Sequence, residues 1–408
     1  MKSPNLLPSI ADKLLRAYRH FDSGIWTVST INLILAIGSS LSIPFIALYL
    51  HQDRGISMTI VGLILFIGGL GSAAAQVLGG EVSDKLGRRP VFIFSIATRA
   101  LMFGLTAFFM AIAAPVWIIA SFYIVGQAVG MVNMSLTSAI IADLTPRNRL
   151  TEAYGIQRVG VNVGWAAGPA VGGYLASFLD YHWLFAAAAL ITIIPLPIVF
   201  FILRESFGKK MQKIDFRAML SISRDGSFLM FVFFSSLIFL VMGQMLSTLS
   251  VFTVDRIGLD TAQYGFLLTT NGLIVIIFQY PITLLLSRLS FVKTLIAGSL
   301  LYSVGFLLFG WVGGFSLAII AMVIITAGEI IFSPSALSTL GQLSPPQNRG
   351  RYMGFFGLGQ TLGWMTAPLF GGILLDMFPT EPIVIWGTIA SIAVIAALGF
   401  YAWTKKVG

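Results

Sequence analysis

The most constraining feature of this 408-residue sequence is a series of long apolar stretches separated by short polar connections. A membrane core of roughly 30 Å needs about 20 apolar residues in each helical crossing. Hydrophobic residues make up 57% of the chain and charged residues only 10%, which leaves too little polar surface for a water-soluble globule. The sequence therefore predicts an all-α integral membrane protein with twelve transmembrane helices, at about 24–50, 57–81, 90–112, 115–141, 151–178, 182–203, 227–254, 262–287, 291–312, 315–341, 351–376 and 382–403.

The Lys and Arg residues are placed asymmetrically between these predicted helices. Most of the 25 lie before the first helix, after the last one or in every second connection, whereas Arg54 and Arg256 lie in the other set of connections. Because positively charged loops stay in the cytoplasm, the chain is predicted to be a multi-pass cell membrane protein with both termini cytoplasmic. This placement accounts for the net charge of +9 without nucleic-acid binding.

Cysteine and histidine usage limits the chemistry that the chain can support. The sequence has no cysteine, and its three histidines fall at ends of predicted helices. Neither a metal site nor a catalytic triad can be assembled from them, so we expect no metal, no cofactor and no enzymatic activity.

The second half of the sequence repeats the first at an offset of 199 residues. Residues that superpose on the same type in the second half are Pro146, Gly155, Gly160, Gly164, Trp165, Pro169 and the pair Gly172-Gly173. The longest polar segment separates the halves, which predicts a six-helix bundle at 1–203, a cytoplasmic linker at 204–225 and a second six-helix bundle at 226–408. Two similar bundles suit alternating access around a shared site, as in secondary transporters. The chain has no glycine loop of the kind that binds nucleotides, so hydrolysis is not the expected energy source.

The connection between the second and third predicted helices carries a spaced set of charged residues and glycines. It reads "GGEVSDKLGRRPV", and its defining residues are Gly80, Asp84, Lys85, Gly87, Arg88 and Arg89. A cytoplasmic loop collects basic residues in any membrane protein, but this does not explain Asp84 and the two glycines. The spacing resembles the loop signature of the major facilitator superfamily, and the resemblance covers nearly the whole chain. It implies the major facilitator fold, with two pseudo-symmetric bundles.

The resemblance also implies a conformational latch on the cytoplasmic side. Asp84 is expected to face the start of the eleventh helix, in the other half, because an anion is stabilised at a helix N-terminus. Arg88 is expected to pair with Asp143. Gly80 is expected to allow close approach of helices, and Gly87 a tight turn.

The fifth predicted helix contains the stretch "GWAAGPAVGG", which carries Gly164, Gly168, Pro169, Gly172 and Gly173. Glycines one turn apart allow a neighbouring backbone to pack closely, and a proline inside a helix bends it. Ordinary packing of small residues is one reading of this pattern. The stretch also resembles a motif of the drug:proton antiporter branches of the same superfamily, which favours export.

One acidic residue, Glu329, lies near the middle of a predicted helix, whereas the other acids lie in connections or at helix ends. A charge at the centre of a membrane costs at least about 2.5–3.5 kcal/mol, so such a residue is a functional candidate. We interpret Glu329 as a proton-coupling acid that also attracts cations, as in some relatives implied by the resemblance. The alternatives are permanent pairing with Arg99 or Arg158, and an inert protonated acid.

Several other polar residues lie inside predicted helices. Arg99 and Arg158 are close enough to the cytoplasmic ends for their side chains to extend to the interface, which favours a structural role. The residues that either line a substrate cavity or join helices are Asn32, Gln127, Asn133, Gln244 and Asn271.

These features predict a monomeric, proton-coupled transporter that exports amphipathic, cationic compounds by alternating access. Its expected partners are the small substrate, protons and the lipid bilayer. The alternatives are a proton symporter or uniporter for a nutrient, and a lipid or lysolipid flippase.

Overall fold

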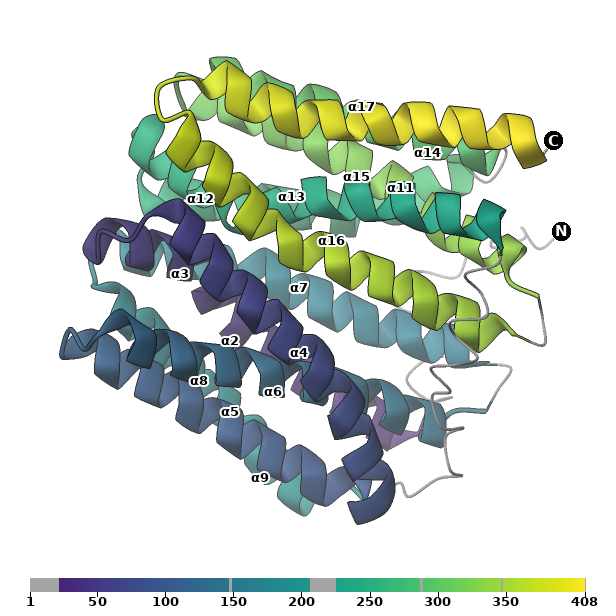
Figure 1. Cartoon of the computed structure of the whole chain (residues 1–408). Helices are drawn as coiled ribbons and strands as arrows, with labels where there is room; N and C mark the ends of the chain where they lie inside the picture. Colours follow the sequence, from purple (N-terminus) through teal and green to yellow (C-terminus); the bar gives the residue numbers. More distant parts are fainter. Residues whose placement is uncertain (1–21, 147–148, 206–224, 287–288, 346–347, 408) are drawn as a thin grey trace, which may run out of the picture.

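Long helices that run back and forth between two faces of the molecule make up the structure (Figure 1). The computed structural model describes residues 22–146, 149–205, 225–286, 289–345 and 348–407, and no strand occurs within these ranges. We call the face where α2 begins at Ser23 and α17 ends at Val407 the terminal face. The opposite face, where α4 begins at Met58 and α16 ends at Met377, is the distal face.

The described helices follow the predicted order, six before and six after the predicted linker. In the first half they are α2 (Ser23–Ser42) continued by η1 (Ile43–Phe45), α3 (Ile46–Leu48) and η2 (Tyr49–Asp53), then α4 (Met58–Leu86), α5 (Arg88–Ala111), α6 (Val116–Leu144), α7 (Leu150–Ala176), and α8 (Tyr181–Ile193) with α9 (Pro195–Phe201). In the second half they are α11 (Gly226–Gly243) continued by η5 (Gln244–Leu246), α12 (Thr248–Val251) and η6 (Phe252–Arg256), then α13 (Thr261–Leu286), α14 (Phe291–Leu308) with η7 (Phe309–Trp311), α15 (Phe315–Leu343), α16 (Arg349–Met377) and α17 (Pro382–Val407).

Ten of the described helices are long and apolar enough to cross a membrane. The two remaining long helices, α7 and α16, have 27 and 29 residues, about 40 Å or more at 1.5 Å per residue. They are long enough to span a membrane but less apolar, because they carry the glycine motifs. The structure thus confirms the all-helical membrane fold. Of the twelve predicted crossings, ten are both long and apolar enough to span a membrane, and α7 and α16 are long enough but less apolar.

The boundary between the second and third predicted helices differs from the expectation. The sequence predicts a loop after residue 81, but α4 continues to Leu86 and α5 begins at Arg88. Gly87 alone joins them, with a φ of +98° that favours glycine. The charged residues of the motif therefore lie on helix ends rather than in a flexible loop.

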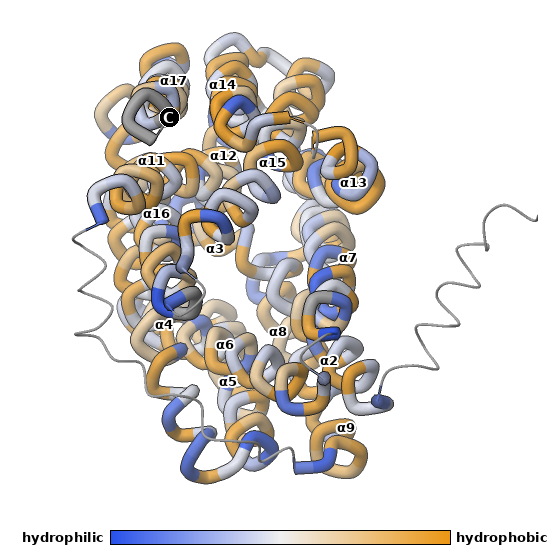
Figure 2. Tube along the Cα trace, turned by 90° about the vertical axis from the view of Figure 1, so that its right-hand side faces the viewer, coloured by the Kyte–Doolittle hydropathy of each residue, from blue (hydrophilic) through white to orange (hydrophobic). Residues whose placement is uncertain are grey.

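The two halves pack by the same rule. In the first half α7 lies against α2 of its own half and α13 of the other half; in the second, α16 lies against α11 and α4 in the same way. Figure 2 shows α7 beside α13 at the junction of the halves. The predicted linker lies largely outside the described residues, at 206–224, so its boundaries stay a prediction.

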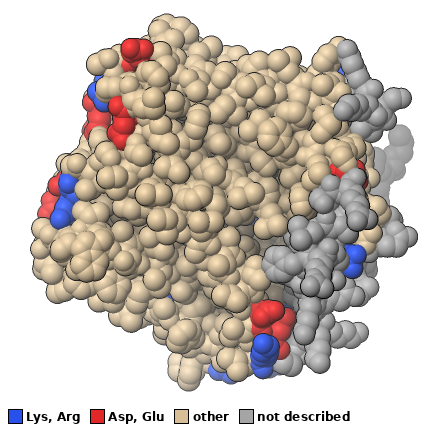
Figure 3. Space-filling view, in the orientation of Figure 1, with Lys and Arg blue, Asp and Glu red and all other residues tan. Residues whose placement is uncertain are grey.

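Most of the described charged side chains lie near the two faces. In the face drawn in Figure 3, acidic and basic residues gather at the ends of the helices, and the broad area between them carries neither. Viewed along the helices, apolar segments dominate the bundle, while α7 carries several hydrophilic segments (Figure 2). This is the polarity expected of a multi-pass membrane protein.

Candidate functional site

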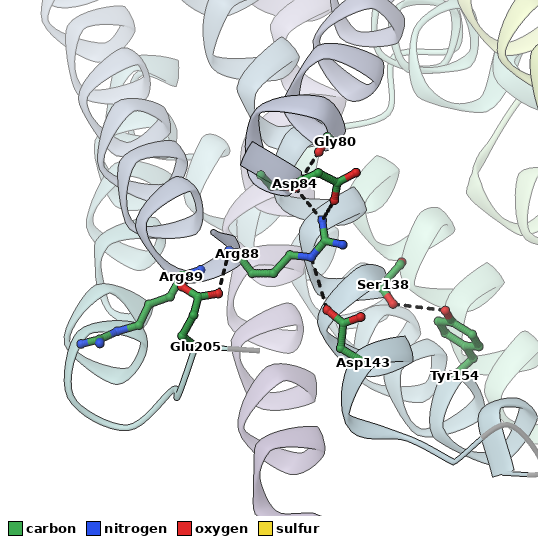
Figure 4. Close-up of polar contacts among 9 residues, drawn as sticks. Gly80, Asp84, Arg88, Arg89, Ser138, Asp143, Tyr154 and Glu205 are labelled. Atoms are coloured by element: carbon green, nitrogen blue, oxygen red, sulfur yellow. Dashed lines mark hydrogen bonds and ion pairs between the residues drawn. The ribbon is translucent and has the colours of Figure 1, made fainter. Parts of the chain in front are cut away.

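Arg88 is the centre of a buried polar cluster at the terminal face (Figure 4). It is the first residue of α5, and only 4% of its surface is exposed. Its Nη1 lies 2.6 Å from Asp84 Oδ1 and donates to Ser83 Oγ, also at 2.6 Å. Its Nε lies 3.3 Å from Asp143 Oδ2, at the end of α6. The structure thus brings together the predicted residues Arg88 and Asp143, and it ties the ends of three helices of the first half.

A carboxylate that sequence reasoning missed completes this cluster. Glu205 follows α9, and its two oxygens accept the backbone N–H groups of Arg88 at 2.8 Å and Arg89 at 3.2 Å. It therefore caps the N-terminus of α5. The Arg89 side chain extends in the other direction, where it donates to the carbonyls of Val199 and Phe200. The signal in the sequence is a lone acid just after an apolar helix, which does not reveal its partner.

Two expectations for the latch differ from the structure. The ion pair formed by Asp84 within the described chain is with Arg88 of its own half, and not with the start of α16. Gly80 does not allow a close approach here, because a Cβ at this position would have no neighbour within 4 Å. The neighbouring glycine has that role instead, since a Cβ at Gly79 would come within 2.5 Å of Val132.

Asp84 and Gly80 lack their expected neighbour because α4 and α16 separate towards the terminal face. On the distal side they are in contact, with Gly62 against Leu369 and Gly69 against Met365. Continuing this antiparallel register would bring Gly80 opposite the first turns of α16. Both Gly80 and Gly357 have open space there. The latch residues are therefore in place on the first half, while their expected partner is withdrawn.

The glycines of α7 use two faces of the helix. Gly164, Gly168 and Gly172 pack against α2, where a Cβ would meet Ala36, Ser40 or the Leu41 carbonyl. Gly173 instead packs against Thr261 and Gly265 of α13, in the other half. The Pro169 carbonyl also contacts Gly265, so the motif joins the first half internally and also joins it to the second.

The equivalent helix of the second half repeats this arrangement. Gly363 packs against Phe239 of α11, and Gly372 packs against the Met58 carbonyl at the start of α4. The residues related by the 199-residue offset thus make equivalent contacts. The internal repeat seen in the sequence corresponds to pseudo-symmetry in the structure.

Two carboxylates join the halves at the distal face. Asp376, in the last turn of α16, accepts the backbone N–H groups of Met58 at 3.0 Å and Thr59 at 2.7 Å. Asp255 of η6 accepts a hydrogen bond from Gln52 and lies 3.4 Å from His51 Nε2. Because α4 begins at Met58, Asp376 caps a helix of the opposite half. The distal face is closed by polar contacts that none of the sequence motifs indicated.

Glu329 lies in the middle of α15, and its polar neighbour is on the adjacent helix of the same half. Asn271 of α13 donates from Nδ2 to Glu329 Oε2 at 2.8 Å, and from the same nitrogen to Thr326 Oγ1 at 3.1 Å. Glu329 as a whole residue is partly exposed. One of the predicted cavity residues therefore holds the predicted coupling acid, a pairing that the sequence did not indicate.

The two intramembrane arginines differ in their relation to Glu329. Arg158 of α7 is exposed, and its charge is near enough to interact with that of Glu329 across the junction of the halves. No ion pair of 4.0 Å or less joins them in the part of the chain that the structure describes. Arg99 lies inside the first half, where its Nη2 donates to Ser39 Oγ at 2.8 Å. Only 6% of Arg99 is exposed, so its side chain lies between helices and does not extend to the interface.

The remaining polar residues of the predicted cavity are mostly buried between helices. Gln244 is fully buried and joins α11 to α16 by donating to the Ala367 carbonyl at 3.1 Å. Asn133 accepts from Ser95, while Asn32 is buried in α2. Gln127 is partly exposed and donates to Tyr123 Oη at 2.9 Å. Gln244 is therefore a contact between helices, and Gln127 keeps the accessibility expected of a cavity residue.

Comparison with known proteins identifies the family. A family model described as Major Facilitator Superfamily matches residues 28–262 and 232–407. The chain is 28% identical over 354 residues to YttB, an uncharacterized MFS-type transporter of Bacillus subtilis (strain 168), with 85% of this chain and 87% of that protein covered. It is 25% identical over 386 residues to the multidrug resistance protein MdtH of Aeromonas hydrophila, with 92% and 94% covered.

A solved structure shares the fold. The crystal structure of a POT family transporter in complex with 5-aminolevulinic acid superposes with a TM-score of 0.76 at 15% sequence identity, covering 94% of this chain and 96% of that one. The family model accounts for most of the sequence, and the arrangement of the helices agrees with it. This protein therefore belongs to the Major Facilitator Superfamily.

Proposed function

We propose that this protein is a proton-coupled antiporter that exports amphipathic, cationic compounds, with Glu329 as the coupling acid. The observation that carries the proposal is the position of Glu329. It lies mid-helix, partly exposed beside the junction of the halves, and has a neutral amide rather than a cation as its direct partner. A carboxylate held in this way can bind either a proton or a cationic substrate, but not both at once.

The same geometry supports alternating access. The halves contact one another at the distal face and have separated towards the terminal face, so Glu329 would be reached from the terminal face in this state. We take the terminal face as cytoplasmic, on the distribution of Lys and Arg. A cation would then bind from the cytoplasm, and a proton from outside would displace it.

The latch residues are expected to act in the opposite state of the cycle, in which the terminal face is closed. Closing the terminal face would bring the first turn of α16 to Asp84, which Arg88 and Asp143 already hold in position. Relatives named for multidrug resistance, such as MdtH, support the direction of transport.

The test compares wild type with Glu329→Gln in proteoliposomes, and with Glu381→Gln, an exposed acid at the distal face, as the matched control. A panel of fluorescent cations is followed with and without an imposed proton gradient. We expect wild type and Glu381→Gln to move the dye in the direction opposite to the proton flow that the gradient drives. Glu329→Gln should lose this response, because glutamine has the shape of the acid but cannot exchange a proton.

Three other outcomes would contradict parts of the proposal. A Glu329→Gln variant that still responds to the gradient would make the carboxyl group structural. Transport in the same direction as the protons would indicate a symporter for a nutrient. Movement of a labelled lipid in place of the dyes would indicate a flippase.

A further inference from the structure

Arg99 is a second buried arginine of the first half and, unlike Arg88, forms no ion pair within the described residues. Among the residues that the structure describes, no Asp or Glu oxygen lies within 4.0 Å of a nitrogen of Arg99. Within the described ranges, its five N–H donors make one hydrogen bond, to Ser39, and Nε is buried without a partner. Phe103 lies under the guanidinium, 5.1 Å from its Cζ. An unpaired buried cation is costly, so this site calls for an anion.

The chain makes room for this guanidinium. A Cβ at Gly130 of α6 would come within 2.7 Å of Arg99 Cζ, so a larger residue there would displace the arginine. The Arg99 side chain thus passes beside α6 at Gly130 and reaches Ser39 of α2. Snorkelling to the interface, the usual way to relieve such a charge, is not used.

Further unpartnered donors lie on the same three helices. The Nδ2 atoms of Asn133 on α6 and Asn32 on α2 are both buried without a hydrogen-bond partner among the described residues. Asn133 is held by Ser95, one turn before Arg99 on α5. These groups are donors, as is the free Nε, and donors are what an anion requires.

The site lies at about the depth of Glu329. Arg99 is eleven residues from the start of α5, about 16 Å along the axis, and Glu329 is fourteen residues from the terminal-face end of α15, about 21 Å. One half thus presents a cation and the other an anion at a similar level in the bilayer.

We propose that Arg99 binds an anionic group, a carboxylate of the transported compound, so that preferred substrates carry a negative group in addition to the positive group attracted by Glu329. This rests on the proposed function, because it adds a second contact with the same substrate. A guanidinium with free donors binds a carboxylate by charge-assisted hydrogen bonds, which removes the cost of its unpaired burial. Arg99 would then select among cations by what else they carry.

The experiment measures equilibrium binding without a proton gradient, so that it does not depend on coupling. The probes are cationic fluorescent dyes that bear a free carboxylate, each paired with its own methyl ester. We expect wild type to bind the carboxylate forms more tightly than the esters. Arg99→Gln should weaken binding of the carboxylate forms roughly tenfold or more and leave the esters within about twofold. Arg99→Lys, which keeps the charge but loses the fork of donors, should lie between the two.

The esters also report on folding, since a variant that has lost its structure would bind neither form. If Arg99→Gln weakens both forms equally while the protein keeps its thermal stability, or weakens neither, the inference is wrong. It is also wrong if wild type prefers no carboxylate over its ester. Dye binding is also measured with chloride replaced by gluconate, to test whether an inorganic anion occupies the site. If chloride changes dye affinity in wild type but not in Arg99→Gln, and the carboxylate has no effect in either, the site holds an inorganic ion and not the substrate. Loss of gradient response in Glu329→Gln is scored separately, so failure here leaves the proposed function standing.

Discussion

The N-termini of α4 and α5 are both capped by a carboxylate from a distant part of the sequence, but from different halves of the molecule. Glu205 caps α5 at the terminal face and belongs to the same half. Asp376 caps α4 at the distal face and belongs to the other half. The chemistry is the same, two backbone N–H groups on one carboxylate. Only the second contact must break when the halves rock. We therefore expect Glu205 to contribute to the stability of the fold, and Asp376 to the ratio between the two conformational states.

The glycines follow the same division. Gly79 packs on Val132 within the first half, whereas Gly372 packs on the Met58 carbonyl across the halves. A contact inside a half persists throughout an alternating-access cycle, and a contact between halves exists in only one of its states. Substitutions at the two kinds of site should therefore differ in what they change.

The largest effect is expected for Gly372→Val. A side chain there would overlap the Met58 carbonyl, and since backbone cannot give way, the distal face should fail to close. Gly80→Val should have the opposite effect, by obstructing the terminal face when α16 approaches. Both variants should lower transport roughly tenfold or more while leaving the fold intact.

The chain contains no cysteine, so spin labels on introduced cysteines can measure this directly. One pair, at Ser57 and Thr380, reports on the distal face, and another, at Leu86 and Met353, on the terminal face. Gly372→Val should lengthen the distal distance, and Gly80→Val the terminal one. Gly313→Ala, at a position with open space around it, is the control. Distances that do not change would show that these glycines have no role in closure.

A smaller effect is expected for Asp376→Ala. Removal of a carboxylate cap costs about 0.5–2 kcal/mol, and this cost falls only on the state with the distal face closed. The population ratio of the two states should shift about fivefold for a loss of about 1 kcal/mol. Glu381→Ala, an acid five residues further on, is the matched control. The labelled pairs measure the ratio, and an unchanged ratio would remove Asp376 from the set of gating contacts.

The sequence predicted what depends on local pattern. Apolar length gave the helices, and the 199-residue repeat indicated the pseudo-symmetry that Gly173 and Gly372 show. The residue types in the latch motif likewise pointed to the cluster around Arg88. The contacts of Glu205, Asp376 and Asn271 were not predicted, because their partners are backbone groups or lie on other helices that no motif connects to them. A motif also cannot say which state is populated, and so Gly80 lacks its expected neighbour here.

Glu205→Gln should change stability without changing the conformational ratio. Glutamine keeps one acceptor oxygen but loses the charge that interacts with the helix N-terminus, so the loss should be about 0.3–1 kcal/mol. We expect a lower midpoint of thermal unfolding in detergent, with both labelled distances as in wild type. A shift in either distance would contradict the assignment of this cap to one half.

The smallest effect is expected for His51→Gln, at the second distal contact. His51 Nδ1 lies 2.7 Å from the Ile56 carbonyl, and Nε2 lies 3.4 Å from Asp255 Oδ2. His51 belongs to the first half and Asp255 to the second, so His51→Gln should weaken a contact that exists only while the distal face is closed. Because the pair is partly exposed and Gln52 also holds Asp255, the population of that state should fall only about twofold. The labelled distal pair measures this population. His182→Gln is the matched control and should leave the population unchanged, because the partner of His182 is Asp180 of the same half. An unchanged population in His51→Gln would leave Asp376 as the carboxylate that controls the distal face.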